Sequence, residues 1–167
     1  ASKMVDPMYT EPTVLMCPPD VFGIEYEINP WMNRDRQCNR DLAESQWWNF
    51  RHLLEHAGLA VLNLRPVAGL PDLVFTANAA LVVRNTAIIS RFRPLQRRGE
   101  EDHTRFWFSE HAFRIHDLTG NAFFEGAGDA LFLGDILFAG YHVRSDILAH
   151  HTIAKIIGRR VIPLELV

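Results

Sequence analysis

The sequence contains few cysteines, which excludes folds held together by disulfide frameworks or structural zinc. Of its 167 residues, only Cys17 and Cys38 are cysteines. Two thiols can neither build a disulfide framework nor supply the four clustered ligands of a structural zinc site. Eight histidines are present, but the close pair His52 and His56 is not followed by a second cluster at ligand-like spacing. We therefore expect two reduced thiols, no metal site and no cofactor.

Long apolar runs and an excess of basic residues are also missing. No apolar run approaches the roughly 18 residues that a membrane-spanning helix needs, and residues 1–12 are polar, without the apolar stretch of a signal peptide. The formal net charge is −3 and the pI is about 6.2, so neither nucleic acid nor an anionic membrane is an expected partner. The sequence favours a cytoplasmic protein that binds a small molecule or another protein.

The most informative pattern is an internal repeat with an offset of 50 positions. Residues 74–90 align with residues 124–140, so that the run Ala80 to Val83 falls on Ala130 to Leu133. The turn pair Arg84-Asn85 then falls on Gly134-Asp135. Each copy predicts two apolar strands joined by a tight turn.

Helical and strand patterns follow each predicted hairpin. We expect helices over 100–113 and 145–157, the second closed by Gly158, and closing strands over 114–118 and 160–166. A less regular earlier copy has strands at 13–17 and 60–64 around a helix at 41–56. After a tail of residues 1–12, the sequence predicts an α/β domain of three strand-strand-helix-strand units, roughly 13–68, 69–119 and 120–167. The alternative is a generic α/β domain with coincidental similarity.

Three segments place polar groups at the ends of predicted strands, where α/β proteins often hold their sites. They are residues 28–32, 71–78 and 124–129. Asp72 and Glu125 lie there in apolar sequence, which is unfavourable unless each carboxylate meets a cation or several hydrogen-bond donors. A cationic ligand is one solution. The alternative is that Asp72 caps a turn after Pro71 and that Glu125 pairs with a nearby arginine.

Two further features bear on the ligand. The glycines in residues 125–129 precede a strand and lack the Lys-Ser/Thr ending of a phosphate loop, so nucleotide binding is disfavoured. Arg97 and Arg144 each lie near a predicted helix start and could hold a carboxylate through paired donors. A solvated surface charge is the alternative for each.

Together these residues resemble the pentein, or guanidino-group-modifying, superfamily, and most closely its arginine dihydrolases. The resemblance covers nearly the whole chain from Thr13, and the runs 17–19, 28–32, 76–78 and 124–129 occur in the family's order. The family fold is an α/β propeller of five units around a central site. The resemblance thus implies an incomplete propeller with three of the five units.

The resemblance also implies roles for individual residues. Asp72 and the catalytic carboxylate Glu125 would hold a substrate guanidinium, in a pocket also lined by Asn29, Asn78 and Asp129. Arg97 and Arg144 would bind the amino-acid carboxylate of an arginine-like substrate. Phe75 matches an aromatic residue that packs on the substrate, although an ordinary core phenylalanine is the alternative.

The family's chemistry needs two groups that are not expected in this chain. A cysteine thiolate attacks the guanidinium carbon, ammonia leaves with a histidine as acid and base, and water hydrolyses the covalent intermediate. That histidine and cysteine lie in the family's later units, and neither Cys17 nor Cys38 matches the nucleophile. Asn78 favours the dihydrolases, because several hydrolases and deiminases that resemble the chain carry an acidic residue near that point.

The sequence therefore indicates the N-terminal, substrate-binding part of a guanidine C–N hydrolase acting on L-arginine or a close analogue. Transfer of the amidino group to an amine, and a non-catalytic binding module on the same fold, are the alternatives. The chain stops at Val167 within a strand pattern, so we expect further C-terminal units or another chain to cover its open edges. A homo-oligomer is compatible with this expectation.

Overall fold

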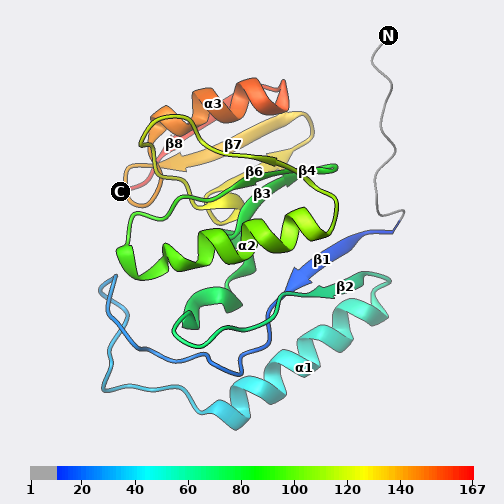
Figure 1. Ribbon diagram of the computed structural model, residues 1–167, viewed down its shortest axis with the longest axis vertical. Helices are drawn as coiled ribbons and strands as arrows, with labels where there is room; N and C mark the ends of the chain where they lie inside the picture. Colours follow the sequence, from blue (N-terminus) through cyan, green and yellow to red (C-terminus); the bar gives the residue numbers. More distant parts are fainter. Residues whose placement is uncertain (1–10) are drawn as a thin grey trace.

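The computed structural model describes residues 11–167, which form an α/β fold whose three helices follow one another along its long axis, each running roughly across it (Figure 1). The helices are α1 (Arg40–His56), α2 (Gly99–Glu110) and α3 (Ile147–Ile157). The strands are β1 (Thr13–Met16), β2 (Ala60–Asn63), β3 (Ala80–Val83), β4 (Thr86–Ile89), β5 (Arg114–His116), β6 (Ala130–Leu133), β7 (Ile136–Tyr141) and β8 (Val161–Glu165). Short 3-10 helices are η1 (Pro71–Val74), η2 (Thr76–Asn78), η3 (Leu95–Arg97) and η4 (Gly126–Gly128).

The predicted repeat is confirmed by two equivalent hairpins. In the first, β3 pairs antiparallel with β4 and Ala80 lies opposite Ile89. In the second, β6 pairs with β7 and Ala130 lies opposite Ala139, which is the same register 50 positions later. The turns also match, because Arg84 and Gly134 have left-handed φ values of 55° and 59° at the same turn position.

The predicted helices and closing strands are also present, with bounds that differ from the predicted ones by up to three residues. Within each of the later two units, the closing strand pairs parallel to the outer hairpin strand, β5 with β4 and β8 with β7. Helix α3 begins at Ile147 and not at Ser145, because Asp146 is extended (φ −99°, ψ 141°). The helix ends as predicted at Gly158, whose φ of 64° suits glycine.

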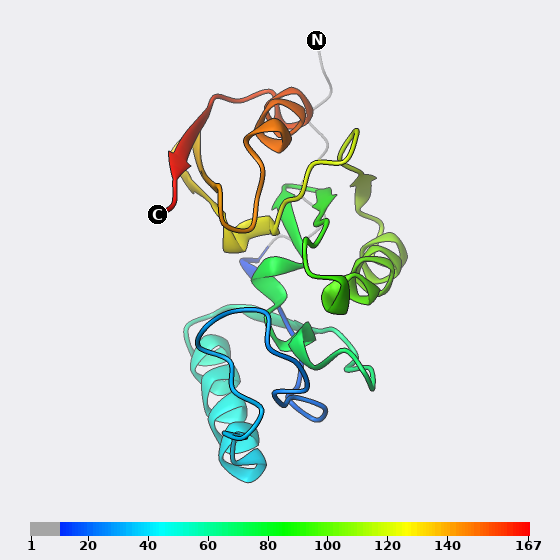
Figure 2. The same ribbon diagram turned by 90° about the vertical axis from the view of Figure 1, so that its left-hand side faces the viewer.

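The first unit differs from the prediction, which was wrong to give it the same strand-strand-helix-strand order. Within residues 11–167 its sheet contains only β1 and β2, paired in parallel. This pair corresponds to β4–β5 and β7–β8, so the counterpart of the inner strands β3 and β6 is not formed by the described residues. Helix α1, which connects β1 to β2, lies at one end of the molecule (Figure 2), and none of its residues is buried.

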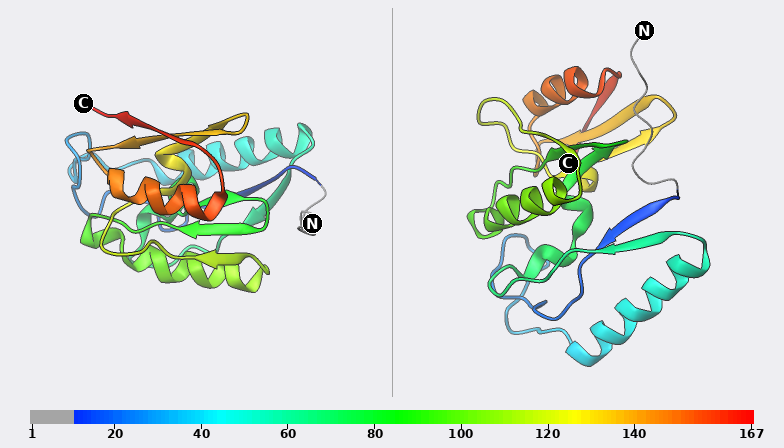
Figure 3. Two further views of the ribbon diagram at one scale, coloured as in Figure 1. Left: turned by 90° about the horizontal axis from the view of Figure 1, so that it is seen from above. Right: turned by 45° about the vertical axis from the view of Figure 1, so that its right-hand side comes forward.

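Buried side chains join consecutive units. Since side chains alternate across a strand, Leu81 and Ile88 of the first hairpin pack with Leu137 and Ile153 of the third unit. The neighbouring Ala87 and Ile89 face helix α2. Cys17, Leu64 and Leu73 form a smaller core between the first unit and the second. The hairpins of the second and third units therefore lie close together, which Figure 3 shows from two sides.

Two further features complete the description. A groove of about 570 Å³ is lined mainly by apolar residues of β1, β3 and β6, among them Leu15, Val82 and Leu131. Among residues 11–167, no helix combines the length and apolar character required to cross a bilayer.

Candidate functional site

Two of the predicted carboxylates reach the site on short turns that precede the inner strands. Asp72 lies in the first turn of η1, directly after Pro71, and is 4% exposed. Glu125 directly precedes η4 and is 2% exposed. Because β3 and β6 lie in neighbouring sheets, the turns before them meet, and both carboxylates contact one guanidinium group, that of Arg97.

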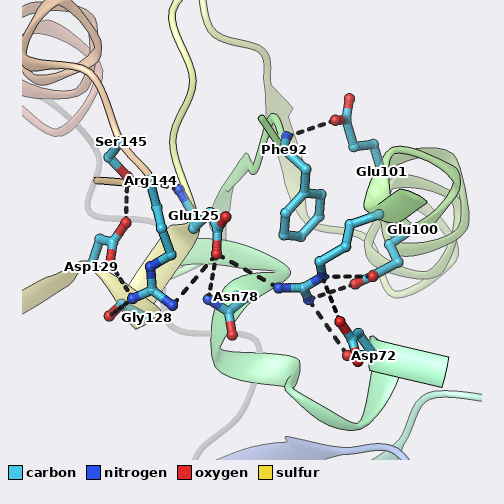
Figure 4. A network of polar contacts seen from close by, with 11 residues as sticks. Asp72, Asn78, Phe92, Glu100, Glu101, Glu125, Gly128, Asp129, Arg144 and Ser145 are labelled. Carbon is cyan, nitrogen blue, oxygen red and sulfur yellow. Dashed lines mark hydrogen bonds and ion pairs between the residues drawn. The ribbon is translucent and has the colours of Figure 1, made fainter. Parts of the chain in front are cut away.

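Arg97 lies at the centre of the site and is itself buried. Its Nε and Nη2 each donate to one oxygen of Glu100 at 2.8 Å, a paired geometry that fixes the plane of the guanidinium (Figure 4). Its Nε is 3.6 Å from Oδ2 of Asp72, and its Nη1 is 3.6 Å from Oε2 of Glu125. The guanidinium also lies 4.2 Å from the ring centre of Phe92.

Glu125 is held from three sides. The side-chain amide of Asn78 donates from Nδ2 to Oε2 of Glu125 at 3.1 Å. Nη1 of Arg144 approaches the same oxygen at 3.6 Å. The backbone N–H of Glu125 donates to Oγ of Ser145 at 3.1 Å. The opposite carboxylate oxygen, Oε1, accepts no hydrogen bond from residues 11–167, so it can accept one from a ligand.

A second anchored arginine lies beside this group. The Ser145 hydroxyl donates to Oδ2 of Asp129 at 2.6 Å, and Nη2 of Arg144 donates to Oδ1 of Asp129 and to the carbonyl of Gly128. The side chain of Arg144 is 44% exposed. Arg144 is thus fixed at one edge while the rest of its guanidinium faces solvent and Glu125.

The electrostatics of the site are dominated by burial. Removal from water is the main cause that raises the pKa of Asp72, Glu100 and Glu125, and the positive charge of Arg97 opposes it in each case. Burial and then the charge of Asp72 also raise the pKa of the Tyr26 hydroxyl, which lies in the loop between β1 and α1. The existing arginines therefore do not fully compensate the buried acids.

Most of the predicted site residues meet in one cluster, and two lie apart from it. The cluster contains Asp72, Asn78, Arg97, Glu125, Asp129 and Arg144. Asn29 is exposed, and its Oδ1 accepts from the backbone N–H groups of Trp31 and Met32 in its own loop. Phe75 is 48% exposed and packs edge to face on Phe22.

The alternatives weighed from the sequence also have a structural basis. Asp72 does lie in the first turn after Pro71, but η1 has Leu70 as its N-cap and no side-chain cap hydrogen bond, so Asp72 does not cap this turn. Glu125 does lie near arginines. However, four carboxylates, those of Asp72, Glu100, Glu125 and Asp129, are buried around only two guanidinium groups. Pairing within the protein therefore leaves an excess of buried negative charge, which a cation would balance.

Sequence reasoning missed two residues of the cluster. Glu100 is 2% exposed and lies three residues after Arg97, a spacing at which two side chains meet on a helical turn. Ser145 is 1% exposed and directly follows Arg144. The spacing to Arg97 was the available signal for Glu100, whereas a serine next to an arginine carries no comparable signal.

The structure does not make Cys17 a reactive thiol. Burial, followed by the charge of Asp20, raises the pKa of the Cys17 thiol to about 12, so it stays protonated at neutral pH. Cys38 is also a free thiol and is half-buried. Among the residues that the structure describes, no group of three or more His, Cys, Asp or Glu side chains could hold a metal ion.

Comparison with known proteins supplies relatives for this arrangement. No family model matches the chain. It is 40% identical over 157 residues to the bifunctional arginine dihydrolase/ornithine cyclodeaminase ArgZ of Synechocystis sp., covering 92% of this chain and 22% of that protein. It is 37% identical over 152 residues to the N(G),N(G)-dimethylarginine dimethylaminohydrolase of Mycobacterium tuberculosis, covering 91% of this chain and 50% of that protein.

Solved structures agree with the sequence relatives. The N-terminal domain of ArgZ bound to its product superposes with a TM-score of 0.88 at 39% identity, over 93% of this chain and 57% of that one. A dimethylarginine dimethylaminohydrolase adduct shares the fold with a TM-score of 0.77 at 18% identity, over 94% of this chain and 61% of that one. The chain spans only part of the length of each relative. It is therefore a homologue of part of the N-terminal domain of the arginine dihydrolase ArgZ and of part of the dimethylarginine dimethylaminohydrolases, enzymes of the guanidino-group-modifying (pentein) superfamily.

Proposed function

We propose that this chain binds the guanidinium group of L-arginine or a close analogue, as the substrate-binding part of a guanidine C–N hydrolase. The observation that carries the proposal is the excess of buried carboxylates over guanidinium groups around Asp72 and Glu125. A guanidinium ligand would supply the missing charge and donate to carboxylate oxygens that residues 11–167 leave free, such as Oε1 of Glu125.

The two arginines suit the other end of such a substrate. Arg144 is held at its Nη2 by Asp129, and Arg97 is held at its Nε and Nη2 by Glu100, so both keep Nη1 directed toward Glu125. Anchored guanidinium groups are suited to bind a carboxylate without reorganisation, and part of the Arg144 guanidinium is also exposed. We assign Arg144 as the main carboxylate ligand because it is partly exposed, and Arg97 as the inner one.

The proposed reaction class is arginine dihydrolysis, with the thiolate and the acid–base histidine contributed from outside these 167 residues. The relatives include an N-terminal domain of ArgZ described as bound to product and another described as covalently bound to a reaction intermediate. The high pKa of the Cys17 thiol argues against a nucleophile at that position. By this proposal, purified chain binds arginine but releases no ammonia from it.

Calorimetric titration of the chain with L-arginine and with L-citrulline tests this proposal. Citrulline replaces the guanidinium by a neutral ureido group, so we expect binding of arginine only. Glu125→Gln or Asp72→Asn should weaken arginine binding about tenfold or more, because each removes a charge-assisted hydrogen bond. Asp117→Asn is the matched control, since Asp117 is an exposed carboxylate paired with Arg105. Equal affinity for both ligands, or equal losses in all three variants, would refute the proposal.

A further inference from the structure

Two equivalent turns of the repeat touch each other at the site. Helix η2 (Thr76–Asn78) precedes β3, and helix η4 (Gly126–Gly128) precedes β6 at the same offset of 50 positions. Asn78 and Gly128 are therefore equivalent positions in consecutive units. Asn78 carries a side chain that reaches into the cluster, whereas Gly128 carries none.

The missing side chain at Gly128 leaves the space that Asn78 occupies. A Cβ atom built on Gly128 would lie 2.4 Å from Nδ2 and 3.0 Å from Cγ of Asn78. The first distance is far inside van der Waals contact, so any side chain at Gly128 would displace the Asn78 amide. That amide is the group that donates to Oε2 of Glu125 at 3.1 Å (Figure 4).

Backbone conformation does not explain the glycine. Gly128 does not have a left-handed φ, whereas Gly126 in the same turn has a φ of 57°. A Cβ on Gly126 would meet backbone atoms of Ala80 at 2.8 Å, so Gly126 is required by the fold itself. A Cβ on Gly128 meets only the end of a side chain, which can move. A glycine at position 128 is therefore needed to leave room for the Asn78 side chain, and not for the conformation of the backbone.

We infer that Gly128 is a positioning residue, which seats the Asn78 amide so that it fixes the Glu125 carboxylate. The hydrogen bond orients Oε2 toward Asn78 and the two arginines, and leaves Oε1 for a ligand. With the amide displaced, a buried carboxylate would lose a donor and its orientation. The consequence for a guanidinium ligand rests on the proposed function, whereas the seating of Asn78 does not.

The direct test follows the side-chain amide signals of Asn78 by NMR in the 167-residue chain, identified by their loss in Asn78→Ala. Glu125→Gln should shift these signals in the native background. In Gly128→Ala the signals should already be displaced, and adding Glu125→Gln should move them little. Gly23→Ala is the control, since its Cβ would make only an ordinary contact of 3.5 Å with Gln37. Native-like Asn78 signals in Gly128→Ala would overturn the inference.

A second variant covers the case in which Gly128→Ala does not fold. Removing the Asn78 side chain relieves the contact, so Gly128→Ala with Asn78→Ala should fold; failure of this double variant would also overturn the inference. Where arginine binding is measurable, Gly128→Ala should weaken it about tenfold alone and not further in the Asn78→Ala background. If the native chain binds no arginine, the proposed function fails while the amide signals still decide the role of Gly128.

Discussion

The first unit and the two that follow it are built to different degrees of completeness. In the second and third units, a three-stranded sheet packs against a helix with buried residues, such as Phe108 in α2 and Ile153 in α3. In the first unit, two strands carry a helix whose Leu53 and Phe50 are 67% and 55% exposed. The clustered carboxylates and arginines come from the second and third units alone. The site thus lies in the two units whose sheets pack against a helix with buried residues.

The largest expected effect concerns the ion cluster between these two units. Arg97→Ala would leave Asp72, Glu100 and Glu125 buried without their shared cation. We expect the free energy of unfolding to fall by about 3–5 kcal/mol, measured by urea denaturation. Arg51→Ala in the first unit is the control, because its pair with Glu55 is partly exposed and is expected to contribute less than about 1 kcal/mol. Similar losses in both variants would contradict this account of the cluster.

The next test compares the helices. Ile153→Ala in α3 removes a fully buried side chain and should lower the free energy of unfolding by about 2–5 kcal/mol. Leu53→Ala in α1 removes an exposed one and should change it by less than about 0.5 kcal/mol. The same denaturation curves measure both. A large loss for Leu53→Ala would show that α1 is packed in solution against something that buries this side chain.

A smaller effect distinguishes the ends of the three helices. The chain becomes left-handed after each helix, at Gly58 (φ 84°), Ala112 (φ 56°) and Gly158 (φ 64°). Ala112 is the only one of the three with a Cβ, which this conformation disfavours. Ala112→Gly should therefore stabilise the chain by about 0.5–1 kcal/mol in thermal unfolding, whereas Gly158→Ala should destabilise it by about 1 kcal/mol. Stabilisation by Gly158→Ala would contradict the assigned conformation.

The smallest expected effect is a pH dependence that arises in α3. Burial lowers the pKa of His150 below its usual value of 6.5, so the unfolded chain binds a proton more readily than the folded one. Its contribution to stability is complete above pH 6.5 and is lost as the pH falls from there toward the lowered pKa. Between pH 7.5 and 5, His150→Gln should reduce the fall in the free energy of unfolding. His151→Gln, at an exposed position, should leave this fall unchanged. If the free energy of unfolding depended on pH in the same way in both variants, His150 would be excluded as the source of the pH dependence.

The comparison between units also explains what the sequence could predict. Both hairpins, the helix ends before Gly58 and Gly158, and the burial of Asp72 and Glu125 follow from local periodicity, turn residues and the position of charges in apolar runs. The missing inner strand of the first unit could not be predicted, because the pattern of residues 13–17 fits either strand of a hairpin. The pairing of Arg97 with Glu100 had a signal in their three-residue spacing. The contact of Gly128 with Asn78 depends on two units meeting in space.

The central claim is that Asp72 and Glu125 together hold a guanidinium cation. The most direct measurement is a crystal structure of the chain with bound L-arginine. We predict that the guanidinium group lies against both carboxylates, with the ligand's carboxylate toward Arg144. Arginine bound elsewhere, or bound here with its guanidinium directed into solvent, would contradict the claim.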